Sequence, residues 1–303
     1  MDIPRIKLNN GVEIPCIGNG PAALGYSPTQ KKYSENIIAR IYRHFITVPK
    51  MKRDYVDAVA HSFQIGFTLL DYSSSYGDGK LIGEAIKKSG VSRENLFITT
   101  RISNGAQKEG KIRECLMNQL NGMGIEYVDM LMFHWPVTDY YLETWKEMIQ
   151  LYKEGYCRCL GVANCHKHHL EALMTVSDIV PAINQFEVHP LFTQKELINY
   201  CWNKGIQVEA YTAIARFDDR LMRLPLLKGL AKKYNKTVVQ VILRWHIQVG
   251  TIPLVRSLNK SRQKENINIF DFKLTPEEIQ AIDAININSR LRYDPDNCDF
   301  SIL

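Results

Sequence analysis

Short apolar runs alternate with stretches of helical spacing along most of the chain. The runs at residues 67–71, 96–102 and 128–134 each lead into a polar residue. Such runs predict strands that are buried on both faces, as in a parallel sheet. Further strands are predicted at 15–19, 157–163, 181–187, 207–213 and 251–255. Helices are predicted at 54–64, 78–89, 108–123, 140–154, 166–175, 194–204, 225–233, 237–249, 259–267 and 276–284.

This alternation predicts an α/β fold of one domain that spans residues 1–303. Eight strand-and-helix units without a linker between them favour a closed (β/α)8 TIM barrel over an open doubly wound sheet. Residues 5–16 alternate around Asn10-Gly11, a pair that tolerates positive φ and therefore predicts a β-hairpin. We expect this hairpin to cap one end of the barrel.

Residues 26–53 do not follow the alternation and are interpreted as an insertion. Apolar residues between 33 and 46 have helical spacing, and Pro49 is expected to end the pattern. The segment predicts an amphipathic helix with a basic face. A surface insertion packed on the domain is the favoured interpretation, and a lid or a subunit contact are the alternatives.

Composition narrows the class of protein. The chain has 303 residues, and its 38 basic and 32 acidic residues give a net charge of +6. This charge mildly favours an anionic ligand and lacks the clustered basicity of a nucleic-acid binder. Seven scattered cysteines without a CxxC pair indicate free thiols in a reducing compartment. No apolar stretch has the length of a signal peptide core or a membrane span, so a cytoplasmic location is expected.

Polar side chains follow three successive predicted strands. Asp71, Arg101 and His134 stand at or just beyond the strand ends, and Tyr76 follows five residues after Asp71. The carboxyl ends of the strands form the reactive face of such a barrel, so these side chains should converge. A phenol becomes a good proton donor when nearby positive charge lowers its pKa from about 10.

The group therefore predicts carbonyl reduction by hydride transfer. Tyr76 would donate the proton, Arg101 would supply the charge, and Asp71 would hold Arg101 in place. His134 would orient the carbonyl by a hydrogen bond. Each residue alone also has a common structural interpretation, and only their joint placement favours catalysis.

A glycine-rich segment and a histidine cluster are weaker signals. Gly20 belongs to a formal GxGxxA match, but Pro21 argues for a loop where the dinucleotide fingerprint needs a helix. Gly20 is better explained by close approach of the backbone to a ligand. His166, His168 and His169 suggest a metal site, but no acidic or cysteine partner is evident, and no metal is expected.

In a series of short motifs the chain resembles the aldo-keto reductases. The motifs are LDYSSSY, FHWP, GVAN, INQFE, EAYT, LRWHIQ and RSLNKSRQKEN, in that order and over almost the whole chain. The resemblance implies a (β/α)8 barrel with a hairpin at its bottom and a nicotinamide cofactor bound without a Rossmann domain. It also implies a tetrad of Tyr, Lys, Asp and His.

The resemblance assigns roles to further residues. Tyr76, Asp71 and His134 match the tetrad. Asn164 and Gln185 would hold the cofactor carboxamide, and Tyr211 would stack on the nicotinamide ring. These assignments follow from the resemblance alone.

A phosphate site is implied after the last strand. Arg256, Ser257 and Arg262 would surround a 2′-phosphate, and Glu265 and Asn266 would lie near the adenine. Guanidinium groups and a helix N-terminus suit a dianionic phosphate, which points to NADPH over NADH. The alternative is that the two arginines are solvated surface charges.

The chain departs from the family pattern at several positions. Arg101 stands where the family has lysine, which keeps the charge and changes its geometry, so weakened activity is expected. Ala163 replaces a serine, Gly79 a glutamate and Val255 a proline. The alternative function is a catalytically impaired, NADPH-binding regulatory or scaffold protein with the insertion as its partner surface.

The substrate pocket is expected between loops at the barrel mouth, with Trp135 and Phe300 as apolar walls. Such walls predict broad specificity for aldehydes or ketones. The expected partners are small carbonyl compounds, with neither nucleic acid nor membrane. The protein is expected to be a monomer or a small homo-oligomer.

Overall fold

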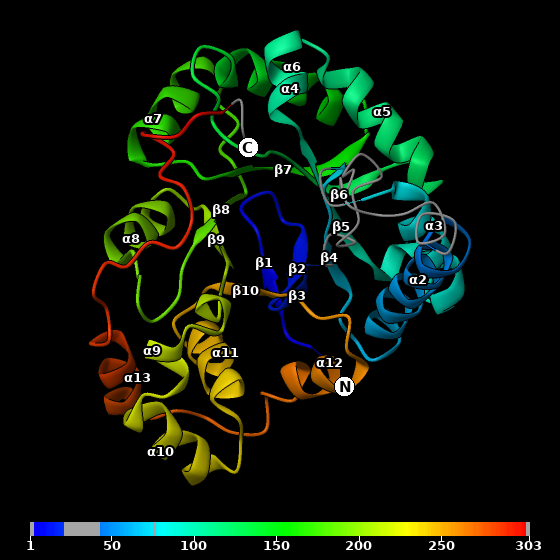
Figure 1. Ribbon diagram of the computed structural model, residues 1–303. Helices are drawn as coiled ribbons and strands as arrows, with labels where there is room; N and C mark the ends of the chain where they lie inside the picture. The colour runs from blue at the N-terminus through cyan, green and yellow to red at the C-terminus, as the bar shows by residue number, and fades with distance from the viewer. Residues whose placement is uncertain (1–2, 21–42, 75–76, 301–303) are drawn as a thin grey trace.

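Eight parallel strands close into a barrel in the computed structural model, which describes residues 3–20, 43–74 and 77–300 (Figure 1). The strand order around the barrel is β10-β3-β4-β5-β6-β7-β8-β9. The strands are β3 (Gly18–Asn19), β4 (Leu69–Asp71), β5 (Phe97–Ile102), β6 (Val128–Phe133), β7 (Cys157–Ala163), β8 (Ile183–Glu187), β9 (Gln207–Tyr211) and β10 (Ile252–Val255). The closed parallel sheet confirms the predicted (β/α)8 barrel.

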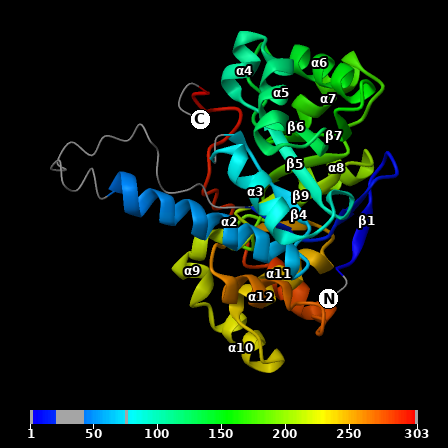
Figure 2. The ribbon, with the colours of Figure 1, turned by 90° about the vertical axis from the view of Figure 1, so that its right-hand side faces the viewer.

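Helices surround the sheet, as Figures 1 and 2 show from two directions. They are α2 (Val48–Gln64), α3 (Gly79–Ser89), α4 (Asn104–Glu109), α5 (Ile112–Met123), α6 (Tyr141–Lys153), α7 (Lys167–Val176), α8 (Lys195–Asn203), α9 (Asp219–Met222), α10 (Pro225–Tyr234), α11 (Val238–Gln248), α12 (Lys260–Ile267) and α13 (Pro276–Asp283). The helix predicted at 108–123 is in fact two, because Gly110 adopts a left-handed φ of 66° and ends α4.

Strand periodicity divides the apolar residues between two cores. Alternate residues of each strand point outward and pack against the helices. The others point into the barrel, where Leu69, Phe97, Met130 and Ile183 form an interior cluster. Gly18 is required here, because a Cβ atom at this position would lie 2.5 Å from the side chain of Leu254.

The predicted hairpin closes one end of this interior. Strands β1 (Arg5–Lys7) and β2 (Glu13–Pro15) pair antiparallel around the turn at Asn10-Gly11. Leu8 and Ile14 are buried and belong to the same cluster as the interior strand residues. The hairpin therefore plugs the barrel, as expected.

The prediction for residues 26–53 is wrong in the part that the structure describes, residues 43–53. Residues 21–42 lie outside the described part. A π-helix, η1 (Arg43–Thr47), leads directly into α2, so Pro49 does not end the helical stretch. Proline is tolerated in the first turn of an α-helix because the N–H that it lacks has no partner there. The side chains of Phe45 and Ile46 are 68% and 51% exposed, so they do not enter the core.

The described residues contain no helix that is both long and apolar enough to cross a membrane.

Candidate active site

A cavity of about 730 Å³ opens at the carboxyl ends of the barrel strands. It is lined by residues from strand ends, from the loop after β9 and from the C-terminal tail, which we define as residues 286–300. Its walls are Gly20, Asp71, His134, Trp135, Asn164, Gln185, Tyr211, Thr212, Ala213, Ile214, Arg216, Phe217, Leu254, Val255, Arg256, Arg292 and Tyr293. Many residues that the sequence singled out therefore share one site.

The floor of this cavity is set by strand periodicity. Asp71 lies two residues after Leu69 on β4, and Gln185 lies two residues after Ile183 on β8. Side chains two residues apart on a strand point to the same face, so both polar groups project into the barrel directly above the interior cluster. Arg101 and Glu209 reach the same level from β5 and β9. We call Asp71, Arg101, Gln185 and Glu209 the polar layer.

A buried ion pair is the centre of the polar layer. Nη2 of Arg101 lies 2.6 Å from Oδ1 of Asp71, and the two residues are 1% and 6% exposed. Nη1 of Arg101 donates to the backbone carbonyl of Tyr72 at 3.2 Å. Removing one partner of such a pair leaves a buried charge without compensation, which costs about 3–5 kcal/mol. The guanidinium charge is therefore fixed beneath the cavity.

Gln185 links this ion pair to a second carboxyl group. Its Oε1 accepts from Nη2 of Arg101 at 2.6 Å, and its Nε2 donates to Oε2 of Glu209 at 2.8 Å. Complete burial, and then the negative charge of Asp71, raise the pKa of Glu209 to about 8. Glu209 is thus largely protonated at pH 7, and the layer then carries one negative and one positive charge. The sequence analysis missed Glu209, although its position two residues before Tyr211 on the same strand face was a usable signal.

His134 lies just beyond β6 on the same inward-facing set of residues as Met130 and Met132. Burial, and then the positive charges of Arg101 and Arg292, lower its pKa to about 3. The ring is therefore neutral at pH 7. A neutral imidazole has one N–H donor and can hydrogen-bond a carbonyl oxygen without competing for the proton.

Asn164 and Tyr211 meet at the ends of β7 and β9. The Tyr211 hydroxyl donates to Oδ1 of Asn164 at 2.7 Å, and Nδ2 of Asn164 donates to the His134 carbonyl oxygen at 2.9 Å. Asn164 has a positive φ of 60°, which asparagine tolerates better than most residues. These bonds fix the Tyr211 ring beside the cavity, where it presents an aromatic surface.

The loop after β9 forms a further wall with unusual backbone geometry. Thr212, Ala215, Arg216 and Phe217 all have φ between 48° and 62°. Non-glycine residues in the left-handed region cost about 1–3 kcal/mol when they are strained, and such strain concentrates at binding sites. The unusual backbone conformation of this loop is therefore typical of a binding site.

Cationic groups gather where β10 leads into α12. Arg256 is exposed and lines the cavity, and Arg262 lies in the first turn of α12. The backbone N–H of Asn259 donates to Oγ of Ser257, and Oδ1 of Asn259 caps the helix by accepting from the N–H of Arg262. In the described residues neither guanidinium has a carboxylate within 4.0 Å. The helix N-terminus and the two guanidinium groups fit a phosphate.

Of the two residues predicted near the adenine, Glu265 already has a hydrogen-bond partner and Asn266 is buried. Glu265 accepts a hydrogen bond from the Thr237 hydroxyl at 2.9 Å, and Asn266 is 6% exposed. Their assignment to the adenine remains a prediction.

The C-terminal tail closes the apolar side of the cavity. The buried Glu187 carboxylate accepts from the backbone N–H groups of Leu291 and Arg292 at 2.8 and 2.9 Å. Farther along, the Phe300 ring centroid lies 6.4 Å from that of Trp135. The two predicted apolar walls are therefore neighbours.

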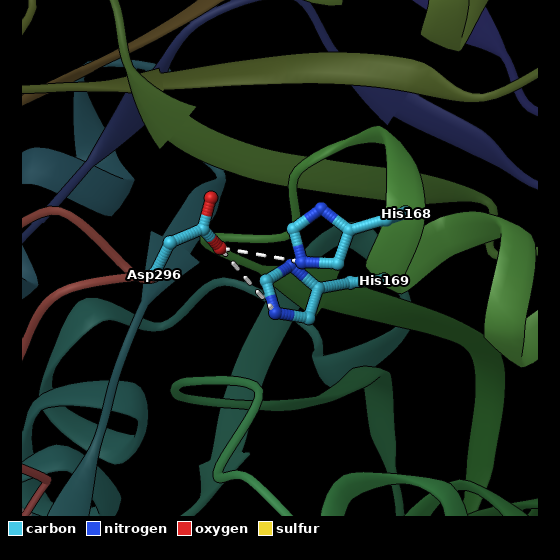
Figure 3. Close-up of side chains that lie close together, drawn as sticks. All are labelled: His168, His169 and Asp296. Carbon is cyan, nitrogen blue, oxygen red and sulfur yellow. Dashed lines mark ion pairs between the residues drawn. The ribbon is translucent and has the colours of Figure 1, made fainter.

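The histidine cluster does have an acidic partner, so the premise of the sequence interpretation was wrong. Asp296 of the tail lies 2.7 Å from Nδ1 of His166. Its carboxylate also lies 3.3 Å from Nε2 of His168 and 3.7 Å from Nε2 of His169 (Figure 3). These distances would allow a cation. Burial lowers the pKa of His169 to about 4, so its ring is neutral at pH 7. Its Nδ1 accepts from the His166 backbone N–H, so the ring carries its proton on Nε2, facing Asp296. Asp296 and the three histidines therefore hold the tail against the N-terminal end of α7, although Asp296 is 127 or more residues away from them in the sequence.

The structure thus brings together Asp71, Arg101 and His134, and it places Asn164, Gln185, Tyr211, Gly20 and Arg256 around the same cavity. Tyr76 lies outside the described residues. Arg292 lines the cavity although the sequence analysis did not select it. Nothing in the local sequence signals this position, because the path of the tail depends on Glu187.

The chain is similar to known proteins over most of its length. A sequence model described as the aldo/keto reductase family matches residues 47–287. An uncharacterized oxidoreductase, YtbE, of Bacillus subtilis is 43% identical over 296 residues, which cover 98% of each chain. Glyoxal reductase of the same organism is 35% identical, and the alignment covers 97% of each chain. The crystal structure of a Bombyx mori aldo-keto reductase in complex with NADP has a TM-score of 0.82 and 32% identity, covering 98% of this chain and 97% of the other.

Proposed function

Since this chain belongs to the aldo-keto reductase family, we propose that it reduces aldehydes or ketones to alcohols with NADPH as the reductant. The proposal rests on the buried Asp71–Arg101 ion pair. Asp71 and a neutral His134 line the same cavity at the carboxyl ends of the strands. We further propose that residues 1–303 form one domain.

The proton donor in this proposal is Tyr76, five residues after Asp71 in the LDYSSSY motif. When bound, NADPH supplies the hydride that the carbonyl carbon gains, and the Tyr76 hydroxyl gives its proton to the carbonyl oxygen. His134 donates a hydrogen bond to the same oxygen. Because its pKa is far below 7, this ring remains a neutral donor through the physiological range.

Arg101 supplies the positive charge that favours the ionised phenol. Lysine would concentrate the same charge on one nitrogen, whereas the Arg101 guanidinium spreads it over a fork whose contacts include Asp71 and Gln185. The charge remains within the site, but part of its hydrogen-bonding capacity serves the polar layer. We therefore propose a working enzyme whose phenol is less strongly activated than a lysine would make it.

The cofactor phosphate is proposed to bind Arg256, Ser257 and Arg262 at the start of α12. Support comes from the exposed guanidinium groups and the helix N-terminus described above. Asn164 and Tyr211 are proposed to contact the nicotinamide. Gln185 could contact the nicotinamide only by giving up one of its present hydrogen bonds, because both of its polar atoms already have partners in the polar layer.

Steady-state NADPH oxidation tests the proposal. Glyoxal, methylglyoxal and aromatic aldehydes form a suitable panel, because similar proteins are named glyoxal reductase and methylglyoxal reductase. We expect measurable turnover, with NADH at least tenfold poorer in kcat/KM. The Arg101→Lys variant should change kcat by less than about tenfold, since the charge is retained.

The alternative function gives a different result. A regulatory or scaffold protein on the same barrel would bind NADPH tightly, as followed by cofactor fluorescence, and would show no turnover above background. If Arg101→Lys then created activity, the natural site would be catalytically impaired.

A further inference from the structure

The C-terminal tail places a third guanidinium group at the cavity. Arg292 lines the same cavity as His134 and Trp135. Its backbone N–H is held by the buried Glu187 carboxylate at 2.9 Å, so the path of the tail at this residue is fixed by the barrel itself. Arg292 is exposed.

This guanidinium has no acidic partner in the described part of the chain. Its Cζ atom lies 5.6 Å from the centroid of the Tyr293 ring. Arg290, two residues earlier, differs: it lies 4.0 Å from Asp294 and 4.8 Å above the Phe192 ring, and it does not line the cavity. A cation directed into a cavity without a counter-charge is suited to an anionic ligand.

Arg292 belongs to the substrate end of the cavity. Its charge is close enough to His134 to contribute, after burial and Arg101, to the lowered pKa of that ring. The proposed phosphate site of the cofactor is at Arg256, beyond β10 on another part of the wall. An anion bound by Arg292 would therefore be part of the molecule whose carbonyl meets His134.

We propose that Arg292 binds a carboxylate of the substrate, so that oxo acids and aldehyde acids are the preferred substrates. This inference rests on the proposed carbonyl reduction and specifies its substrate class. A guanidinium fork matches the two oxygens of a carboxylate and can donate to both. Trp135, Phe217 and Tyr293 line the same cavity, so an apolar or aromatic body between the carbonyl and the carboxylate is accommodated.

A matched pair of substrates isolates the charge. 4-Formylbenzoate and its methyl ester present the same aldehyde on the same ring, with and without the negative charge. We expect wild-type kcat/KM to be roughly tenfold higher for the acid, through a lower KM. The preference should shrink as salt is raised, because the guanidinium is exposed.

Variants assign the preference to one residue. Arg292→Gln should raise KM for the acid roughly tenfold, leave its kcat within about twofold, and leave the ester unchanged. Arg292→Lys should restore part of the preference, because the charge returns without the fork. Arg290→Gln is the matched control on the same tail and should keep the full preference. Equal loss for acid and ester in Arg292→Gln, or a raised KM for NADPH alone, would overturn the inference.

Binding decides the inference separately from turnover. Calorimetry with 4-methylbenzoate and its methyl ester, which have neither the aldehyde nor the alcohol of the proposed reaction, in the presence of saturating NADP⁺, should show that only the acid loses affinity in Arg292→Gln. If the wild type reduces neither aldehyde, the proposed reductase function fails, and an absent acid preference in calorimetry overturns the carboxylate site. If the ester is reduced, and wild type and Arg292→Gln have the same KM for the acid, the proposed reductase function is supported and the proposed role of Arg292 is wrong.

Discussion

The polar layer and the tail are two parts of one cavity that are built in opposite ways. The polar layer takes four side chains from two pairs of neighbouring strands, β4 and β5 on one side of the barrel and β8 and β9 on the other, and none is more than 6% exposed. The tail contributes Arg292 and Tyr293, which are exposed, and holds its course through a few polar contacts with Glu187 and the histidine cluster. The comparison indicates that strand register fixes the groups of the proposed chemistry, whereas the tail, where we propose that selectivity resides, is held by few contacts.

Breaking the polar layer should have the largest effect. Arg101→Met leaves the Asp71 carboxylate buried without its cation, and we expect the free energy of unfolding to fall by about 3–5 kcal/mol. Urea denaturation measures it. The matched control is Arg158→Met: the Asp129 carboxylate there keeps Arg93 at 2.7 Å, and Arg158 is half exposed, so the loss should be about 1 kcal/mol or less. Equal losses in the two variants would contradict the special status of the layer.

Glu209 should impose a pH dependence on stability. Its pKa is raised to about 8 in the folded state from an ordinary value of 4.5, so the folded state retains a proton that the unfolded chain loses between these values. The stabilisation is complete below pH 4.5 and is lost as the pH rises through 8. Glu209→Gln keeps the shape and removes the titration, so at pH 8.5 it should be more stable than wild type by roughly 2–4 kcal/mol.

The measurement is a series of urea denaturations from pH 5 to pH 9. Glu196→Gln, an exposed change on α8, should follow the wild-type curve. A Glu209→Gln curve parallel to that of wild type would show that Glu209 titrates normally.

Releasing the tail should affect binding more than folding. Asp296→Asn removes the negative charge that three imidazoles share on α7, and residues 290–300 should exchange amide hydrogens at least several-fold faster. KM for aldehydes should rise a few-fold with kcat nearly unchanged. Glu171→Gln, which alters an exposed ion pair with Lys167 on the same helix, should change neither quantity.

The smallest effect is expected at the outer wall. Phe300→Ala removes the ring next to Trp135, and KM for aromatic aldehydes should rise about two- to fivefold while small dicarbonyls such as methylglyoxal are unaffected. A change of the same size for both substrate classes would place Phe300 outside the substrate pocket.

The sequence predicted the features that depend on local periodicity. Apolar runs ending in Asp71 and Arg101 identified two strands and two members of the polar layer, because a strand fixes both the direction and the face of its side chains. Glu209 was not predicted, because it lies two residues before the end of its strand, where its side chain also points into the barrel. Periodicity contained that information.

Other features depend on contacts between distant segments and could not be predicted. The pairing of Asp296 with His166 joins residues 130 positions apart, and the placement of Arg292 depends on a carboxylate at Glu187. Pro49 is compatible with two predictions, because a proline ring breaks the interior of a helix but is favourable in its first turn. Only the three-dimensional path of the chain distinguishes these cases.

The most direct test of the account is the proton donor. Benzaldehyde reduction by wild type and Tyr76→Phe should be followed as NADPH consumed and benzyl alcohol formed, with NADPH affinity measured in parallel. We predict one alcohol per NADPH for wild type, and a fall in kcat of at least about 100-fold for the variant at unchanged NADPH affinity. A Tyr76→Phe enzyme that retains wild-type turnover, or a wild type that forms no alcohol, would contradict the account.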